Sequence, residues 1–188
     1  MRRLAGAVAA LVLALSLSSC SVLTSLDASP GVSPSSPVEA PANLAATLDE
    51  ALDALASTET FTAHGTEHVL SGEINRKGAA VGYHSTALGD LAAGQILPGT
   101  ASAADGHGLY EAQVSVSGTN KTSNDGYSTF FPASWTAQQV VDAINEAYGS
   151  RVSSGDGGYD GVTSGGITVH MYLDDSDLIT TAYPVMEN

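Results

Sequence analysis

The chain of 188 residues contains one cysteine, Cys20. A lone cysteine excludes an internal disulfide, so a folded domain in this chain must be held together by its hydrophobic core. The sequence after residue 42 is long enough for that purpose, because roughly 130 to 145 residues are one domain's worth of chain. We therefore expect a single domain stabilised by its core, beginning well after the N-terminus.

Residues 1–19 have the pattern of a secretory signal peptide. Two arginines follow the first methionine, and the apolar run 5–17 is too short to span a bilayer. The motif Leu-Ser-Ser-Cys at 17–20 resembles a bacterial lipobox, in which the cysteine is lipidated and becomes the first residue of the mature protein. We expect an extracytoplasmic protein anchored to the outer face of the bacterial cell membrane through a lipid on Cys20. The alternative is an ordinary cysteine near a conventional cleavage site.

Residues 20–42 are rich in Ser, Pro and Ala, which predicts a disordered tether because their prolines block helix and sheet continuation. Without the signal peptide the chain keeps four basic and all twenty acidic residues, a formal charge of −16. Nonspecific nucleic-acid affinity comes mainly from Lys and Arg. A nucleic acid could therefore bind only in a small pocket with few phosphate contacts.

Periodicity predicts an α+β class with antiparallel strands and a few packed helices. Residues 43–58 have leucines at helical spacing, which predicts an amphipathic helix ahead of a domain at 59–188. A second helix should begin after Thr136, which forms a capping-box pair with Gln139, and stop at Gly149.

Alternation of apolar and polar residues predicts a strand at 110–116 and a hairpin at 167–183, which turns at the acidic cluster 174–177. The Gly-rich segment 153–166 has few apolar residues and is expected to be a loop.

Two histidines and a lysine are candidates for acid–base chemistry at a phosphate. An imidazole pair such as His68 and His84 can supply one neutral and one protonated ring at the same pH, which predicts a bell-shaped dependence of rate on pH. Lys121 could then balance the charge that builds on phosphorus. The residues alone leave open that all three are surface or structural groups.

Several motifs occur in an order and spacing that carry a family resemblance. They are His68–Gly72, Gly82–Ser85, Asp105–Val114, Lys121, Ser128–Pro132 with Trp135, and Thr181–Pro184. From about Glu67 to the C-terminus they resemble the bacterial EndoU ribonuclease family. The resemblance implies an EndoU-like domain that cleaves RNA without a metal or other cofactor, preferably at uridylates. The 2′-hydroxyl would attack the phosphate to leave a 2′,3′-cyclic phosphate.

The resemblance also implies roles for individual residues. It makes His84 the general base, His68 the general acid and Lys121 the partner of the phosphate. Backbone N–H groups near Gly82, which has no side chain, could approach a nonbridging oxygen.

The substrate-binding residues implied by the family are Thr181 and Tyr183, whose side chains should project from one face of a strand. Tyr183 would stack on the uracil or ribose, and Ser128 could contact uracil. The alternative for the terminal pair is a buried Thr and Tyr that close a sheet.

The other histidines carry weaker signals. His64 and His68 have the spacing of two metal ligands on a helix, but Gly65 lies between them and no third ligand is evident, so we expect no metal site. His107 should be a turn residue, and His170 alternates with core positions and should therefore face outward.

Two other classes of function remain open. The fold could be kept as a noncatalytic cell-surface binding module, or the chain could be an unrelated structural lipoprotein. The partners expected for the leading hypothesis are an RNA substrate and, through Cys20, a membrane. One chain does not reveal whether an immunity protein exists.

Overall fold

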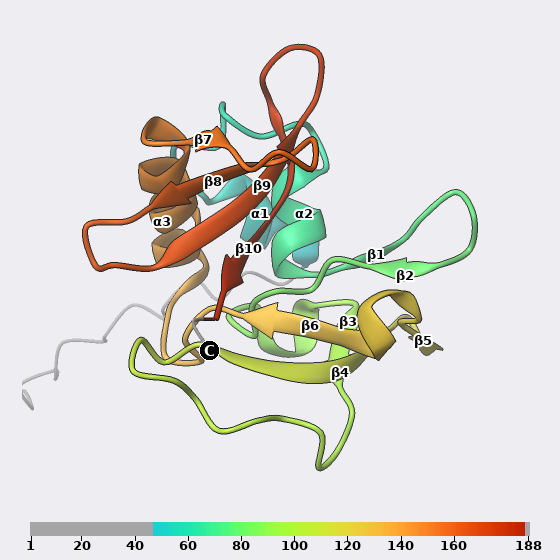
Figure 1. The fold of residues 1–188 in the computed structure, drawn as a ribbon. Helices are drawn as coiled ribbons and strands as arrows, with labels where there is room; N and C mark the ends of the chain where they lie inside the picture. Colours follow the sequence, from blue (N-terminus) through green and yellow to red (C-terminus); the bar gives the residue numbers. More distant parts are fainter. Residues whose placement is uncertain (1–46, 187–188) are drawn as a thin grey trace, which may run out of the picture. The chain divides into compact units, whose positions relative to one another are not determined.

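The computed structural model describes residues 47–186 (Figure 1). The expected signal peptide, Cys20 and the tether of residues 20–42 lie outside this range. Within the described residues, no helix has both the length and the apolar character needed to cross a membrane.

The described chain contains three α-helices and ten strands, which confirms the α+β class. The helices are α1 (Leu48–Asp53), α2 (Gly65–Leu70) and α3 (Ala137–Gly149). The strands are β1 (Glu73–Ile74), β2 (Ala80–Val81), β3 (Gly94–Ile96), β4 (Tyr110–Val116), β5 (Thr119–Asn120), β6 (Tyr127–Phe130), β7 (Val152–Ser153), β8 (Tyr159–Val162), β9 (Thr168–Leu173) and β10 (Ile179–Val185). Short 3₁₀ turns occupy Gly89–Leu91 and Ser123–Gly126.

The C-terminal part of the domain is a sheet in the order β10-β9-β8-β7, and every neighbouring pair in it is antiparallel. Helix α3 packs on this sheet, as Figure 1 shows. The capping box between Thr136 and Gln139 is present, as predicted, and Val140, Val141 and Ile144 of the helix are fully buried. Their burial against the apolar residues of β9 and β10 forms the larger hydrophobic core of the domain.

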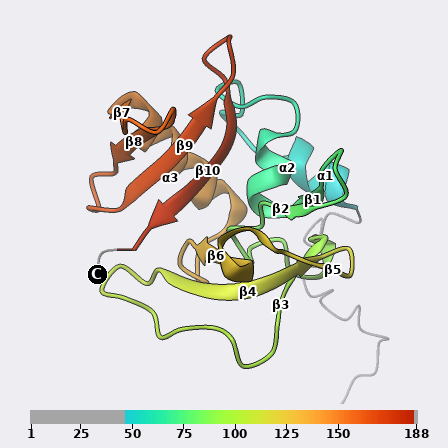
Figure 2. The same cartoon turned by 45° about the vertical axis from the view of Figure 1, so that its right-hand side comes forward.

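A second sheet joins β3, β4 and β5, and β6 pairs with β4 at the other end of that long strand. The predicted strand 110–116 is therefore confirmed as β4. Its inward residues Ala112, Val114 and Val116 are completely buried and form a smaller core with Phe130 and Tyr83. Figure 2 shows this sheet below α2 and β10, with β6 lying nearest to β10.

The N-terminal helix is shorter than the predicted 43–58. It begins after Thr47, which forms a capping box with Glu50, and it ends at Asp53. No residue of α1 is fully buried, although Leu52 packs partly against the larger core. The leucine spacing predicted this helix, but α1 is only six residues long. Residues 43–46 lie outside the described range.

The prediction of a loop at 153–166 is wrong, because β8 lies within that segment. Strand β8 is glycine-containing because α3 crosses it closely: a Cβ at Gly161 would lie 1.9 Å from the carbonyl oxygen of Ala147. The glycine that suggested a loop is therefore the residue that allows the helix to approach the sheet.

Candidate active site

A cavity of about 480 Å³ opens between α2, β6, β10 and the chain from Val81 to His84 at the end of β2. It contains every residue predicted from the sequence to act on or bind a substrate. The lining residues are His68, Val81, Gly82, His84, Lys121, Ser123, Asn124, Tyr127, Ser128, Thr129, Thr181 and Tyr183. None of them is acidic, although seventeen acidic residues lie among residues 47–186. The cavity is therefore suited to an anion.

The backbone after α2 brings the two histidines together. The amide of Tyr83 donates to the carbonyl of His68 at 2.9 Å, and the amide of His84 donates to the carbonyl of Val69 at 2.7 Å. Gly82 and Tyr83 both have positive φ, at 75° and 63°. A Cβ at Gly82 would lie 2.1 Å from the carbonyl oxygen of His68, so only glycine fits.

His84 is held as a neutral ring with a free acceptor nitrogen. The side chain is buried, and Nδ1 lies 2.8 Å from the carbonyl oxygen of Thr129, which can only accept. Nδ1 therefore carries the proton and Nε2 is unprotonated. The pKa of His84 is lowered to about 3, first by burial and then by the positive charge of Lys121; the bond to Thr129 opposes these effects, and His68 adds a smaller decrease. The ring can thus accept a proton at neutral pH.

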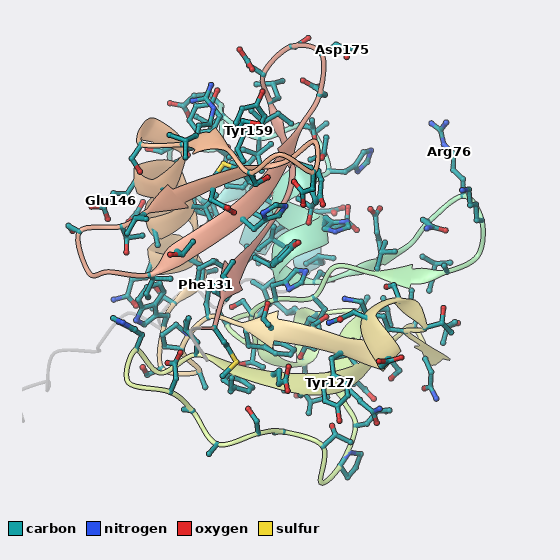
Figure 3. The ribbon with its side chains drawn as sticks, in the orientation of Figure 1. Arg76, Tyr127, Phe131, Glu146, Tyr159 and Asp175 are labelled. Atoms are coloured by element: carbon teal, nitrogen blue, oxygen red, sulfur yellow. The ribbon has the colours of Figure 1, made fainter. Side chains whose placement is uncertain are left out.

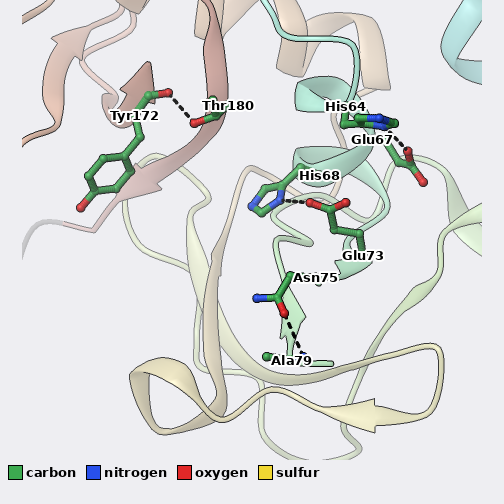
Figure 4. A network of polar contacts seen from close by, with 8 residues as sticks. All are labelled: His64, Glu67, His68, Glu73, Asn75, Ala79, Tyr172 and Thr180. Atoms are coloured by element: carbon green, nitrogen blue, oxygen red, sulfur yellow. Dashed lines mark hydrogen bonds and ion pairs between the residues drawn. The ribbon is translucent and has the colours of Figure 1, made fainter. Parts of the chain in front are cut away.

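His68 is held differently. Its side chain is 16% exposed, and Nδ1 lies 2.9 Å from Oε1 of Glu73 (Figure 4). This contact fixes the ring through Nδ1, so that Nε2 is the nitrogen left for a substrate. A similar pair, His64 and Glu67, lies near the start of α2 at 3.5 Å, but there the histidine is 78% exposed.

Lys121 is tied to the backbone beside the histidines through Ser128. Its Nζ donates to Ser128 Oγ at 2.8 Å, and that hydroxyl donates to the carbonyl of Gly82 at 3.0 Å. Burial lowers the pKa of Lys121 to about 8. Ser128 is 1% exposed and its hydroxyl is bonded on both sides. In this geometry Ser128 positions Lys121, whereas the sequence suggested that it contacts uracil.

Thr181 and Tyr183 project from β10 into the cavity, as their spacing predicted. The ring of Tyr183 stacks on His84 with 5.3 Å between ring centroids and 26° between planes. Burial, followed by smaller contributions of which Tyr172 is the largest, raises the pKa of Tyr183 to about 12. Its hydroxyl is therefore a neutral hydrogen-bond donor over the whole physiological range.

The prediction that His170 faces outward is wrong. It is 6% exposed, its Nδ1 lies 2.7 Å from Oδ1 of Asp160, and its ring centroid lies 5.1 Å from that of Tyr183. Helix α3 packs on one face of the sheet, and on the other face the rings of Tyr172 and Tyr183 from the same sheet pack around His170. Alternation indicated only that His170 and the core residues lie on opposite faces. The predicted turn at His107 is present.

Several lining or supporting groups were not predicted. Glu73 orients His68, the main-chain carbonyl of Thr129 orients His84, and Asn124 and Tyr127 line the cavity. A carbonyl acceptor leaves no signature in the residue type that supplies it. Glu73 could have been suspected only with knowledge that α2 ends between it and His68.

Residues 47–186 contain no group of three or more His, Cys, Asp or Glu side chains arranged to hold a metal ion. The histidines that had the spacing of metal ligands, His64 and His68, are each paired with a glutamate instead.

Comparison with known proteins defines the class. Residues 62–186 match the model of the family described as bacterial EndoU nuclease. A protein of Bacillus cereus named Toxin is 43% identical over 135 residues, which are 72% of this chain and 25% of that protein. No solved structure matches the chain. The chain belongs to the bacterial EndoU nuclease family, and it spans about a quarter of the length of this relative.

Proposed function

We propose that the protein is an endoribonuclease that cleaves RNA on the 3′ side of uridylates without a metal. The observation that carries the proposal is the pair of differently held imidazoles in one cavity. His84 offers an unprotonated Nε2, while His68 is held at Nδ1 by Glu73, which leaves its Nε2 for the leaving oxygen. Concerted transfer needs one proton acceptor and one proton donor at the same pH.

In the proposed reaction His84 Nε2 takes the proton of the 2′-hydroxyl, and the 2′-oxygen forms a bond to phosphorus. The bond from phosphorus to the 5′-oxygen of the next nucleotide breaks, and His68 gives its proton to that oxygen. The products are a uridine 2′,3′-cyclic phosphate and a free 5′-hydroxyl. Lys121 stabilises the negative charge that develops on the nonbridging oxygens.

Uridine would be held on the β10 side of the cavity. Thr181 presents a hydroxyl that can donate or accept, and Asn124 presents an amide that can do both. Such groups match the two carbonyls and the N3–H of uracil. The ring of Tyr183 would contact the base or ribose, an interaction worth roughly 1 to 3 kcal/mol per base.

The ionisation of the site refines the expected pH profile. Because the pKa of His84 is lowered to about 3, the base stays neutral through the range in which a free imidazole titrates. On the acid side, kcat/KM should therefore not fall with the ordinary imidazole value. On the alkaline side Lys121 loses its charge above about pH 8, so kcat/KM should fall there.

The test is incubation of the purified protein in EDTA with an oligonucleotide that contains a single uridine. We expect one cut, a 2′,3′-cyclic phosphate at the uridine, and no cut by His84→Ala. If the wild type and His84→Ala are equally inert across about pH 5 to 8, where imidazole normally titrates, the proposal is wrong.

We also propose, from the sequence of residues 1–20, that the nuclease is exported and anchored through a lipid on Cys20. Metabolic labelling with a radioactive fatty acid should label the wild type and leave Cys20→Ser unlabelled. Equal labelling of both would overturn the anchor. Because the Bacillus cereus relative is named Toxin, we further propose that RNA cleavage damages another cell and that an inhibitor protein protects the producer.

A further inference from the structure

The β1–β2 hairpin projects from the domain beside the cavity (Figures 1 and 3). Its two short strands pair antiparallel, with Ile74 opposite Ala80. The tip is well defined, because the side-chain oxygen of Asn75 accepts hydrogen bonds from the amides of Lys77 at 2.9 Å and Ala79 at 3.0 Å. Gly78 has a φ of 76°, which suits this tight turn.

The tip carries half of the positive charge of the described chain. Residues 47–186 contain four basic residues, of which Lys121 lies in the cavity. Arg151 already has partners on the domain, because its guanidinium lies 3.7 Å from the centre of the Tyr148 ring and 3.9 Å from a carboxylate oxygen of Asp177. Arg76 and Lys77 are exposed at the tip of the hairpin, and neither forms an ion pair with any described residue. Figure 3 shows the side chain of Arg76 pointing away from the ribbon.

The hairpin connects this charge directly to the cavity. Its first residue, Glu73, orients His68, and its last residue, Val81, lines the cavity together with Gly82. Residues 74–89 contain no acidic residue. Only Ala79 and Ala80 lie between the turn at residues 76–78 and Val81 in the cavity wall, a span of about 10 Å. The hairpin itself would thus offer an RNA strand two cations and no carboxylate other than Glu73.

The position of His68 indicates which side of the cleaved linkage would lie along the hairpin. In the proposed reaction His68 protonates the 5′-oxygen of the departing nucleotide, so the RNA on the 3′ side of the cut lies next to His68 and its partner Glu73. Uridine, on the 5′ side of the cut, lies toward Thr181 and Tyr183 on β10.

We propose that the β1–β2 hairpin is a second RNA-binding element, in which Arg76 and Lys77 bind backbone phosphates on the 3′ side of the cleaved linkage. The direction rests on the proposed function, because it depends on which histidine donates the proton. The element extends the interaction beyond the cavity without requiring a broad basic surface.

The experiment compares three RNA substrates that share one cleavable linkage: the dinucleotide UpA, UpA extended with adenosines on the 3′ side, and UpA extended on the 5′ side. In the wild type at low salt, we expect the 3′ extension to raise kcat/KM roughly tenfold and the 5′ extension to raise it far less. In Arg76→Gln/Lys77→Gln, most of the gain from the 3′ extension should disappear. Because this double variant leaves two phosphates without a cation, the slope of log kcat/KM against log salt should become shallower by about 1.4 for the 3′-extended substrate.

Arg151→Gln is the matched control, because it removes a positive charge that is already paired elsewhere on the domain. It should keep the gain from the 3′ extension. An equal gain in the wild type and in the double variant, or a gain from the 5′ extension alone, would overturn the proposal.

A binding measurement separates this proposal from the proposed function. An oligonucleotide with 2′-deoxyuridine at the cleavage position lacks the attacking hydroxyl, so it reports affinity without cleavage. Weaker binding of the 3′-extended form by the double variant, measured by fluorescence anisotropy, would support the hairpin site even if UpA were not cleaved. Unchanged binding would reject the site even if UpA were cleaved.

Discussion

The two walls of the cavity hold their histidines by different means. On the wall that β6 supports, His84 is buried and Lys121 is partly buried, and burial is the first cause of both lowered pKa values. Neither side chain has a carboxylate partner among the described residues. On the wall that α2 and β10 form, His68 is partly exposed and paired with Glu73. The comparison teaches that one histidine is kept neutral by loss of solvent, whereas the other is held in place by a neighbouring carboxylate.

The largest expected effect comes from replacing His84, on the wall that β6 supports. His84→Ala removes the proposed proton acceptor, so kcat should fall about 10³-fold, within the range that general acid–base groups contribute. The matched control is His107→Ala, since His107 lies in an exposed turn outside the cavity. Single-turnover cleavage of a uridine-containing oligonucleotide measures both variants. A loss below tenfold for His84→Ala would mean that another group takes the proton.

Removing the positive charge of Lys121, on the same wall, should have the second-largest effect. Lys121→Gln keeps a hydrogen-bond donor near Ser128 but removes the charge, so kcat should fall about 10²-fold while KM changes less. The measurement is steady-state kinetics at pH 7, with Arg151→Gln as the control for loss of one positive charge. An equal loss in both variants would show that net charge, and not position, is what matters.

The hydroxyl of Ser128, which lies between Lys121 and the carbonyl of Gly82, should have a smaller effect on kcat. Ser128→Ala removes a hydrogen bond to a charged group, worth about 1.5 kcal/mol, so kcat should fall roughly tenfold. Leaving the carbonyl of Gly82 without its partner should also lower the free energy of unfolding by about 1 to 3 kcal/mol. Ser128→Thr, which keeps the hydroxyl, should restore part of the activity. If Ser128 instead binds uracil, Ser128→Ala should change the preference for uridine over cytidine and leave cleavage at cytidine unchanged.

On the wall that α2 and β10 form, the pairing of His68 with Glu73 can be tested by removing the charge of Glu73. Glu73→Gln keeps the shape but replaces a charged hydrogen bond with a neutral one, about half as strong, so kcat should fall about fivefold. The control is Glu67→Gln, because Glu67 is also 35% exposed and also pairs with a histidine, but outside the cavity. Measured by steady-state kinetics at pH 7, only Glu73→Gln should lower kcat. Equal kcat values in the two variants would remove Glu73 from the mechanism.

The last expected effect concerns stability and not the rate of cleavage. The pKa of His84 is about 3 in the fold and about 6.5 unfolded, so the unfolded chain binds the proton first as the pH falls. Stability from neutral His84 is complete above pH 6.5 and is lost progressively toward pH 3. Between pH 6.5 and 4.5 the loss should be about 2 to 3 kcal/mol. His84→Asn should lose less stability over this interval in urea titrations. The same loss in both proteins would show that His84 is not buried in neutral form.

Those parts of the fold with strong local signals were predictable. The capping pair at Thr136 and the spacing of Val140 and Ile144 located α3, and alternation located β4 and the β9–β10 hairpin. Strand β8 was missed because its glycine reflects contact with α3, a tertiary reason that local composition cannot express. The orientation of His170 was missed because alternation says which residues share a face and not whether that face meets water.

The candidate site, like the fold, was predicted only in part. The motifs around His68, His84, Lys121 and Tyr183 predicted residues that the fold brings into one cavity. What they did not predict is how each histidine is held, because that depends on a carboxylate at the start of β1 and a carbonyl of the distant strand β6. The sequence suggested that Ser128 contacts uracil, which stays a prediction, but it could not show that the hydroxyl is bonded to both Lys121 and the carbonyl of Gly82.

The absence of a side chain at Gly82 has a consequence for variation at this position. Replacing one of its two α-hydrogens with a methyl group would place carbon 2.1 Å from the carbonyl oxygen of His68, the proposed acid. A one-base change in the codon, from glycine to alanine, would thus push the two imidazoles apart while leaving both in the chain. An enzyme can in this way be silenced by the gain of one carbon atom, with every reactive group still encoded.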